Sequence, residues 1–249
     1  MSLSGNDNHN KISIRLLPNG VSFFVREKTG KTLLHDTVES VALNEADAVR
    51  EAILSAGILE KPYNQVTITI PTPLFALFPE EFFEPEQIEL YYKTVVGNAE
   101  GKHLLFQHLE ELRMFLLFAL DESLYDFLIR SFIHPEIEHH LSSLLPRINA
   151  QPASKEGNVL YVAHDAQLLS VILFKEGRFF AANAYKCDTV NDALYYTLSV
   201  WKQFQYDQLN DKLYIVGEGA FGEELLREVS QYVQLSAMLL IDKETPCEL

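Results

Sequence analysis

The chain has 249 residues, of which 47% are hydrophobic, so it contains enough apolar material for one large core or two ordinary ones. Its 35 acidic and 20 basic side chains give a net charge of −15, which argues against nucleic acid or an anionic membrane surface as a partner. Two cysteines, Cys187 and Cys247, are too few for a disulfide framework. Residues 1–10 are polar, so we expect them to form a disordered tail. We also expect no membrane insertion and a location in the reducing cytoplasm.

The first half of the chain predicts three antiparallel strands, a helix and a fourth strand. Residues 12–16 alternate apolar and polar side chains, which is the pattern of a half-buried strand, and 21–26 and 32–35 are expected to form the second and third strands. Pro18-Asn19-Gly20 is expected to form the first turn. Asn44 is expected to cap a helix that ends at Ser55. The β-branched stretch 66–70 predicts the fourth strand.

The second half predicts the same order of elements. The predicted strands are 159–163, 168–174 and 178–183. Asn191 is expected to cap the helix that follows them. The remaining elements are predicted at 213–216 (strand), 223–233 (helix) and 237–241 (strand).

These two halves look like copies of one folding unit. Lys28-Thr29-Gly30-Lys31 has a counterpart 147 residues later in Lys175-Glu176-Gly177-Arg178. The same offset places helix start on helix start and strand on strand. A repeat of this length predicts an internal duplication, and it decides the architecture before any single motif does.

The middle of the chain has no evident counterpart in the second half. Its predicted elements are a helix at 79–96, a hairpin of 104–108 with 113–120, a helix from Asp121 to Phe132 and a helix near 137–145. The Pro-, Ser- and Gly-containing stretch that follows has the composition of a linker. We therefore predict a first domain at 11–148, a linker at 149–157 and a second domain at 158–249.

A ββ-β-α-β unit that occurs twice resembles the actin-like ATPase fold, in which two ribonuclease-H-like domains are joined and whose relatives include actin-like proteins of pilus assembly and bacterial cell division. The chain is also similar to a bacterial family of unknown function assigned to this fold. The matching segments are Phe78-Pro79-Glu80-Glu81-Phe82-Phe83, Tyr91-Tyr92, Asp192-Ala193-Leu194-Tyr195-Tyr196 and Leu213-Tyr214-Ile215-Val216-Gly217-Glu218. The resemblance implies a mixed α/β fold in actin-like arrangement and no established activity.

In the actin-like fold, each domain presents an Asp and small residues of a strand–turn–strand to the nucleotide phosphates. Here Arg15 or Leu16 stands at the Asp position of the first copy, and Pro18 lacks an amide that would face phosphate. Counting from Gly177 puts Ala163 at the Asp position of the second copy. Asp165 then falls on a glycine position, where it is either a surviving carboxylate or an ordinary turn residue.

Gly217-Glu218-Gly219-Ala220 lies between a predicted strand and a predicted helix, where glycines of the fold face the adenosine. Glu218 replaces a glycine and would crowd a nucleotide, so the segment is either a nucleotide loop or a plain loop that leads into a helix. Asp165, Gly217 and Gly219 are thus the candidate cofactor-binding residues for ATP and magnesium. We assign no catalytic residue and no resident cofactor or metal.

Two further segments allow competing interpretations. His134-Pro135-Glu136-Ile137-Glu138-His139-His140 would place Glu136 and His140 on one helix face, as metal ligands or as a solvated helix end. Cys187 beside a helix start is either a thiol of lowered pKa or a plain strand-end thiol. The apolar region Phe75–Phe83 is either part of the core or a surface for a protein partner.

The sequence favours a non-catalytic, pseudo-ATPase form of the actin-like fold that serves in binding or scaffolding, because the phosphate-facing Asp residues are missing. The alternative is a divergent ATPase or small-molecule kinase that binds Mg-ATP between the two domains. A metal enzyme built on residues 134–140 is the third reading.

Overall fold

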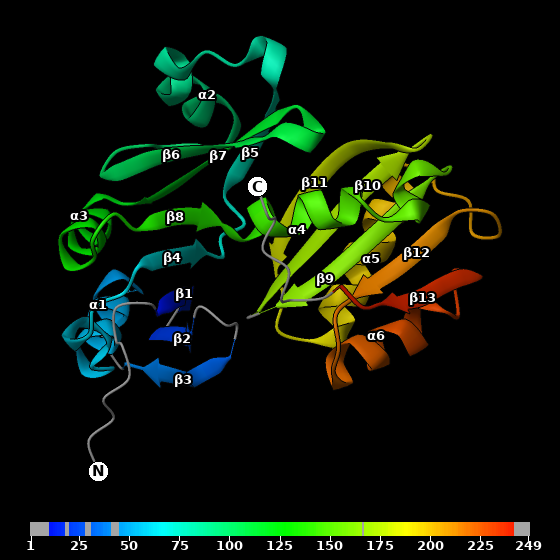
Figure 1. The fold of residues 1–249 in the computed structure, drawn as a ribbon. Helices are drawn as coiled ribbons and strands as arrows, with labels where there is room; N and C mark the ends of the chain where they lie inside the picture. The colour runs from blue at the N-terminus through cyan, green and yellow to red at the C-terminus, as the bar shows by residue number, and fades with distance from the viewer. Residues whose placement is uncertain (1–9, 18–19, 28–30, 41–44, 166, 242–249) are drawn as a thin grey trace. The chain divides into compact units, whose positions relative to one another are not determined.

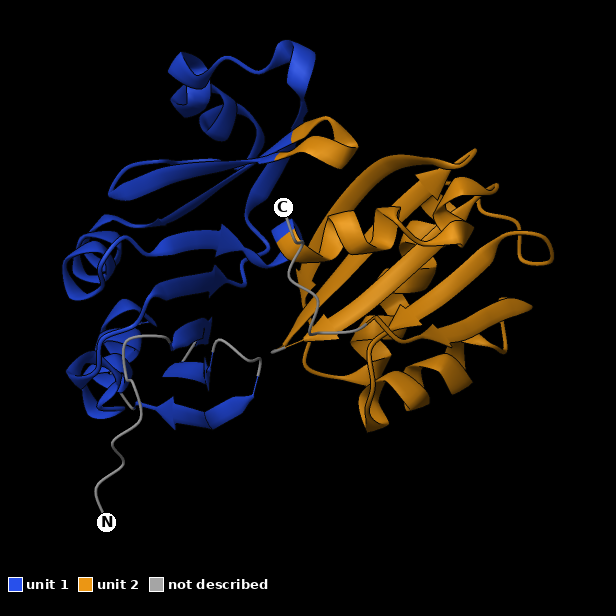
Figure 2. Cartoon of the chain, in the orientation of Figure 1, with its two compact units in different colours: residues 1–108, 115–142 blue, residues 109–114, 143–249 orange. Residues whose placement is uncertain are grey.

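The structure is a computed structural model that describes residues 10–17, 20–27, 31–40, 45–165 and 167–241. The chain divides into two compact units, coloured separately in Figure 2. Unit 1 comprises residues 1–108 and 115–142, and unit 2 comprises residues 109–114 and 143–249. Within the described ranges, no helix is long and apolar enough to cross a membrane.

Unit 1 is built on a mixed five-stranded sheet of order β3-β2-β1-β4-β8 (Figure 1). Its strands are β1 (Lys11–Leu17), β2 (Gly20–Arg26), β3 (Thr32–Glu39), β4 (Gln65–Ile70) and β8 (Glu136–His139). The first three are antiparallel, whereas β4 runs parallel to β1 and β8 runs parallel to β4. The period-two pattern places Ile12, Ile14 and Leu16 in the core. Helices α1 (Glu45–Ser55) and α3 (Glu122–Ser131) belong to the same unit.

A smaller sheet of order β5-β7-β6 is inserted after β4. Its elements are β5 (Phe75–Pro79), α2 (Ile88–Val95), β6 (Lys102–Leu109) and β7 (Met114–Asp121). The predicted hairpin is therefore present, but the helix predicted at 79–96 is wrong in its first half, where β5 ends and two 3-10 turns follow. Asp121 caps α3 as predicted, since its Oδ1 accepts a hydrogen bond of 3.0 Å from Leu124 N.

Unit 2 is built on a second five-stranded sheet, of order β11-β10-β9-β12-β13. Its strands are β9 (Val159–Asp165), β10 (Leu168–Lys175), β11 (Arg178–Lys186), β12 (Lys212–Val216) and β13 (Leu235–Leu239). The helices are α4 (His140–Asn149), whose residues from Ser143 onward belong to this unit, α5 (Val190–Gln203) and α6 (Ala220–Val229).

The unit 2 sheet is covered on both faces. Side chains of α5 and α6, including Trp201 and Leu225, share one buried core with alternate residues of β9, β10 and β12. On the other face, Ser154 Oγ bonds both Ile148 O of α4 (2.6 Å) and the Tyr161 hydroxyl of β9 (2.7 Å). Consequently every residue of β10 from Leu168 to Phe174 is buried, as expected for a strand between two layers.

The two large sheets have the same strand order, third-second-first-fourth-fifth, and the same pattern of parallel and antiparallel pairs. The predicted duplication therefore extends further than the sequence suggested. The stretches 121–132 and 137–145 were predicted to be helices without counterparts, but α3 and strand β8 take the same places in unit 1 that α6 and β13 take in unit 2. Among the described elements, the small sheet, α2 and α4 have no equivalent in the other unit.

Several predicted boundaries are corrected by local interactions. The cap of α5 is Thr189 and not Asn191: Thr189 Oγ1 accepts from Asp192 N (3.1 Å) while Thr189 N donates to the Asp192 carboxylate (3.3 Å). Helix α6 begins three residues earlier than predicted and β13 two residues earlier. The helix predicted near 137–145 is strand β8 followed by α4, which continues past Pro146.

The remaining structural expectations lie partly outside the described residues. These are the tail at 1–9, the Pro18-Asn19 part of the first turn, Gly30 and the Asn44 cap. The stretch expected to be a linker, 149–157, contains a 3-10 turn at Pro152–Lys155, and unit 2 begins before it, at Ser143.

The reciprocal cap at Thr189 gives a direct test of the fold assignment at α5. Replacing Thr189 by Ala removes an acceptor for the first-turn amides and should lower the free energy of unfolding by about 1 kcal/mol. For a chain of this size the melting temperature should fall by about 2–4 °C. The control Asn191→Ala alters the residue that the sequence suggested as the cap and should leave the melting temperature within about 1 °C of wild type. An equal loss in both variants would contradict the assignment.

Candidate functional site

The candidate cofactor-binding residues meet at one edge of the unit 2 sheet. Strands β9, β12 and β13 are parallel, and Val216 at the end of β12 pairs with both Ala163 and Leu239. Gly217 follows β12 directly and Asp165 ends β9, so both lie where these carboxyl ends converge. In open α/β sheets this edge is the usual ligand-binding edge.

The backbone of the glycine loop is open. Gly217 and Gly219 have φ values of 112° and 113°, which side-chain-bearing residues rarely adopt, and a Cβ atom built at either position meets no atom within 4 Å. Gly217 N donates to Leu239 O at 3.0 Å, which holds the loop against the end of β13. Gly219 precedes α6, and among the described residues no side chain caps the first amides of this helix.

Aromatic stacking joins the end of β9 to the first turn of α6. The rings of His164 and Phe221 are nearly parallel, with centroids 3.7 Å apart. His164 Nε2 lies 3.1 Å from Cys187 O, and because a carbonyl can only accept, this nitrogen carries the proton. The sequence did not identify this pair, whose members are 57 residues apart in the chain. The only signal in the sequence was position, since His164 follows a predicted strand and Phe221 lies just before a predicted helix.

No carboxylate stands at the expected phosphate-facing position of either unit. In unit 2 that position is Ala163, half-buried between its register partners Ser170 and Val216, while Asp165 is exposed at the end of the strand. In unit 1 the corresponding residues are Arg15, half-buried on β1, and Leu16, buried in the core.

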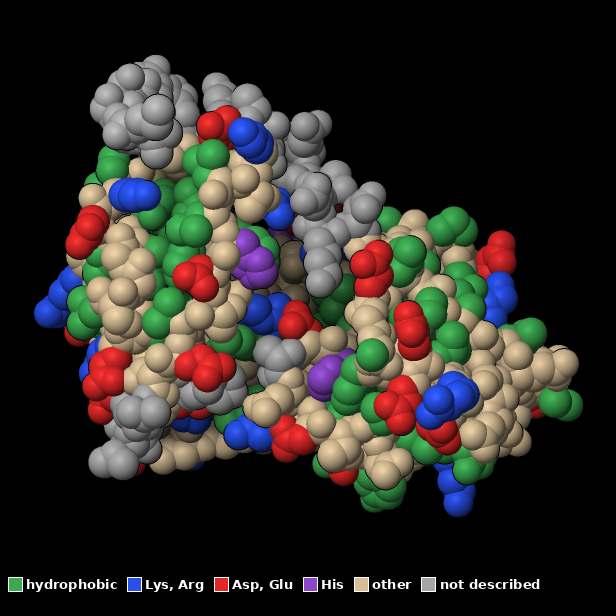
Figure 3. Space-filling view, turned by 90° about the horizontal axis from the view of Figure 1, so that it is seen from below, with side chains coloured by type: hydrophobic (Ala, Val, Ile, Leu, Met, Phe, Trp, Pro, Cys, Tyr) green, Lys and Arg blue, Asp and Glu red, His purple; other side chains and the backbone are tan. Residues whose placement is uncertain are grey.

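The surroundings of α6 are acidic. Glu218, Glu223 and Glu224 are exposed at or near its start, and Arg227 is engaged by Glu228 (3.2 Å) and Glu224 (3.5 Å). Figure 3, which views the molecule from the side of α6, shows acidic side chains spread among basic and apolar ones. Negative charge beside the open amides of the helix opposes the binding of an anion there.

The histidine segment is part of the core of unit 1 and not a helix face. His139 ends β8 and is buried; its Nε2–H donates to Thr72 O (2.9 Å) and its Nδ1 accepts from Leu141 N (3.2 Å). Burial lowers the pKa of His139 to about 3. Burial and the neighbouring His139 and Arg15 charges also hold the pKa of His140 well below its usual range.

The helical ligand pair Glu136 and His140 is therefore not formed, because residues 136–139 are a strand. Among the described residues, no three His, Cys, Asp or Glu side chains are placed to share a metal ion.

Cys187 is the buried thiol of unit 2, and the suggestion that a helix start lowers its pKa is wrong. Burial, reinforced by the Asp192 and Asp188 carboxylates, raises the pKa of the Cys187 thiol to about 11. Its Sγ–H donates to Thr189 O at 3.3 Å. The thiol therefore belongs to the packing beneath α5 and is protonated at neutral pH.

The region Phe75–Phe83 divides between core and surface. Ala76 and Phe83 are buried, and Phe83 stacks on Phe115 of β7 with centroids 4.2 Å apart. Phe82 and Leu74, in contrast, are 65% and 48% exposed. The core interpretation therefore holds for part of the region, and the partner surface stays a prediction for its exposed part.

A family model described as "Protein of unknown function (DUF3822)" matches residues 4–235. The chain belongs to this family. A solved structure from Bacteroides thetaiotaomicron VPI-5482, described as a protein with actin-like ATPase fold and unknown function, is similar with a TM-score of 0.82 and 22% identity, over 99% of this chain and 96% of that chain. No curated protein matches.

The structure of a PilM–PilN type IV pilus biogenesis complex is similar with a TM-score of 0.54 and 12% identity, over 95% of this chain and 92% of that chain. Together with the repeated sheet, these matches confirm the predicted mixed α/β, actin-like fold and the predicted membership in a family of unknown function. At such identities they establish the fold alone.

The buried His139 makes unit 1 sensitive to acid. Its pKa is lowered in the folded chain. As the pH falls, His139 is therefore protonated near pH 6.5 in the unfolded chain but only near pH 3 in the folded chain. The folded state therefore has its full stability with respect to His139 above pH 6.5 and loses stability as the pH falls below that value. Between pH 7 and pH 5 this residue should account for a loss of about 2 kcal/mol in the free energy of unfolding.

Urea unfolding followed by circular dichroism at the two pH values measures this loss. In His139→Gln the decrease between pH 7 and pH 5 should be smaller than in wild type by that amount, whatever the absolute stability of the variant. His134→Asn alters an exposed histidine with a positive φ of 47°, which Asn tolerates, and should keep the wild-type decrease. Identical pH dependence in all three chains would overturn the assignment.

Proposed function

We propose that this protein is a non-catalytic member of the actin-like fold that binds or scaffolds another protein in a reducing cytoplasm. The observation that carries the proposal is the residue set at the phosphate-facing positions, where Arg15 or Leu16 in unit 1 and Ala163 in unit 2 provide no carboxylate. Phosphoryl transfer from ATP depends on magnesium, whose preferred protein ligands are carboxylates.

The stacked pair of His164 and Phe221, next to the expected Asp position of unit 2, supports the same proposal. His164 is held on Phe221 and by the Cys187 carbonyl, so its imidazole fills space between the end of β9 and the start of α6. Glu218 adds a carboxylate to the loop that would have to approach a nucleotide. A site with stacked rings and negative charge beside the helix start is poorly suited to hold phosphates.

A divergent Mg-ATP-binding protein is the second candidate, and one observation favours it. Gly217 and Gly219 keep open, positive-φ conformations before an uncapped helix, and Asp165 lies at the same edge of the sheet. Under this alternative the first amides of α6 would hold the nucleotide, and Asp165 would supply the one carboxylate.

The proposed partner surface is the exposed apolar part of the inserted sheet and α2. It consists of Leu74 (48% exposed), Phe82 (65%), Leu90 (58%) and Val95 (59%). Exposed large apolar side chains on one inserted segment are candidates for contact with a protein partner. The solved PilM–PilN complex, whose fold is similar, is itself a complex of proteins, which agrees with a partner-binding role for this fold.

Calorimetric titration of the purified protein with Mg-ATP and Mg-ADP tests the choice between the two candidates. Because the carboxylates are missing, we expect no saturable heat at ligand concentrations up to about 1 mM. Micromolar binding would contradict the non-catalytic proposal. In that event Gly219→Val and Asp165→Asn should weaken binding if the glycine loop is the site. Gly97→Val, at another open glycine with φ of 133°, controls for backbone strain.

Co-purification from the source cells tests the partner surface. Phe82→Glu combined with Leu90→Glu places charge on the exposed apolar surface without altering a buried side chain. A specific partner should be retained by wild type and lost from the double variant. Ile133→Glu, which charges an 80% exposed apolar residue elsewhere in unit 1, should retain it. If the same proteins co-purify with all three chains, this surface is not the partner site.

A further inference from the structure

Strand β11 is the outer strand of the unit 2 sheet, and it pairs with another described strand on one side only. The sheet order is β11-β10-β9-β12-β13, so β10 is its single neighbour (Figure 1). The two strands are antiparallel, and the amide and carbonyl of every second residue of β11 therefore point away from the sheet. A row of such groups can pair with an extended strand of another chain.

The features that usually protect an exposed sheet edge are missing from most of β11. Proteins protect such edges with short strands, charged side chains or Pro. In the other three end strands of the large sheets, β3 carries Asp36 and Glu39, and β8 and β13 have only four and five residues. Strand β11 has nine residues, and its stretch from Phe179 to Tyr185 contains neither a charge nor a Pro. Its pairing with β10 is irregular at Phe180 but regular from Ala181 onward.

Aromatic side chains lie beside this edge on the α5 side. The Phe180 ring packs against Phe204 at the end of α5, with centroids 5.6 Å apart. Further along the strand, Tyr185 stacks on Tyr196 of α5 with centroids 4.4 Å apart. Phe180 is 55% exposed, and Tyr195, whose ring contacts Tyr196, is 67% exposed. Because every second side chain of an added strand would point to this side, apolar residues there would meet aromatic rings.

Uncompensated positive charge stands at both ends of the same strand. Arg178 and Lys186 are exposed, and neither side chain forms an ion pair or a hydrogen bond with a described residue. The nearest acidic residues in the sequence, Glu176 and Asp188, lie outside the strand. Strand β11 therefore carries only basic charge in a chain whose net charge is −15. Carboxylates on an added strand would be attracted to its two ends.

The same charges disfavour a second copy of the chain as the added strand. If β11 paired along its full length with β11 of another copy in antiparallel fashion, Arg178 would stand opposite Lys186 at both ends. Like charges directly opposite each other destabilise a strand pair. An acidic strand from a different protein avoids this repulsion.

We propose that the outer edge of β11 binds an extended segment of a partner protein as an additional strand of the unit 2 sheet. The segment has alternating apolar residues, which lie on the rings of Phe180 and Tyr185, and acidic residues near its two ends, which lie close to Arg178 and Lys186. This surface is in unit 2, whereas the exposed apolar residues around Phe82 are in unit 1. It therefore goes beyond the proposed function and is tested independently of it.

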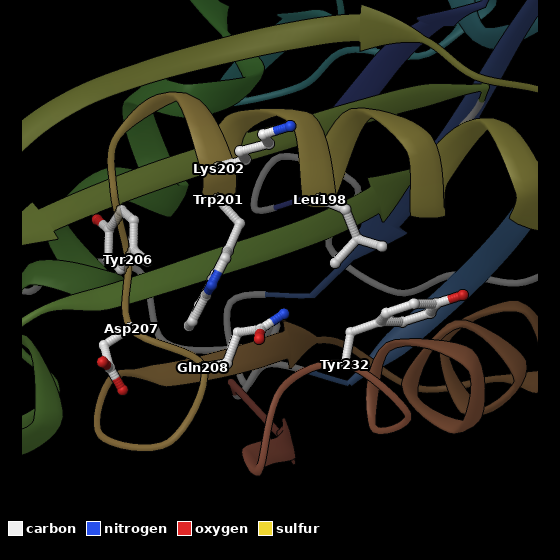
Figure 4. Close-up of a pocket in the computed structure, with 7 residues that line it drawn as sticks. All are labelled: Leu198, Trp201, Lys202, Tyr206, Asp207, Gln208 and Tyr232. Atoms are coloured by element: carbon white, nitrogen blue, oxygen red, sulfur yellow. The ribbon is translucent and has the colours of Figure 1, made fainter.

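A defined peptide titrated into the full-length ¹⁵N-labelled protein at low salt tests the proposal. The probe has nine residues, like β11, with alternating Thr and Val between two terminal Glu residues and with both chain ends blocked. We expect the amide signals of every second residue of β11 to move downfield in a saturable manner, with a Kd of about 1 mM or below. The alternation is diagnostic, because the amides between them already donate to β10. Signals of Gln208 and Tyr232, which line the pocket of about 470 Å³ at the end of α5 (Figure 4), should stay in place.

Two matched peptides separate the contributions of charge and backbone pairing. Replacing both terminal Glu residues by Lys should weaken binding at least about tenfold. Replacing one Val and one Thr by Pro removes an amide from each edge of the peptide and should abolish the alternating shifts. Equal binding of all three peptides, or no saturable shift with the acidic peptide up to about 5 mM, would overturn the proposal. Shifts along β11 that follow protein concentration alone would assign the edge to a second copy and would overturn it as well.

Charge-reversal variants locate the binding on the protein. Arg178→Glu combined with Lys186→Glu inverts the charge at two exposed positions and should reverse the preference, so that the Lys-ended peptide binds more tightly than the Glu-ended one. Lys93→Glu combined with Arg130→Glu makes the same change in net charge at exposed positions of unit 1 and should keep the wild-type preference. The same preference in both double variants would show that binding does not occur at β11.

Discussion

The parallel pairing of the first strand with the fourth strand is the constraint on which the rest of each unit depends. In unit 1 it joins β1 to β4, and in unit 2 it joins β9 to β12. Because parallel neighbours cannot be connected by a tight turn, each unit needs a helix between them, and α1 and α5 supply it. The same pairing sends the carboxyl ends of the strands to one edge. It thereby places the glycine loop at the same edge as Asp165.

The strand arrangement at this edge is that of the actin-like fold, and no carboxylate stands at the positions that we expected to face phosphate. The buried strand residues that hold the sheets together, such as Ile14 and Val162, are independent of whatever occupies the strand ends. Ala163 and the stacked His164 can therefore stand at the end of β9 without any cost to the core. Because the same fold can carry different residues at its strand ends, the fold is a poor guide to activity here.

Local sequence patterns predicted the strands and the repeat because burial of one face imposes a period of two wherever a strand borders a core. These patterns predicted the wrong element where pairing with a neighbouring strand decides the structure. The charged sequence Glu136–His139 has the look of a helix end, but its alignment along β4 makes it an edge strand. The Thr189 cap, by contrast, was visible in the sequence as a Thr followed three residues later by Asp192. Asn191 was predicted instead because Asn and Thr both cap helices, and residue type alone does not choose between them.

The candidate site could be predicted only in part. Its members on β9 and after β12 were found by their spacing from strand ends. Phe221, in contrast, acquires its role through contact with His164, which is distant in the chain. Such a contact exists only once the end of β9 and the start of α6 have been brought together.

The measurement that tests the central claim most directly is a titration of the ¹⁵N-labelled protein with Mg-ADP, followed at the backbone amides of Gly217, Gly219 and Phe221. These groups would approach a bound nucleotide most closely, and their signals do not depend on hydrolysis or on the heat of binding. If the phosphate-binding chemistry has been lost, the three signals stay in place at about 1 mM ligand. Saturable shifts confined to these amides would contradict the account and restore the nucleotide site.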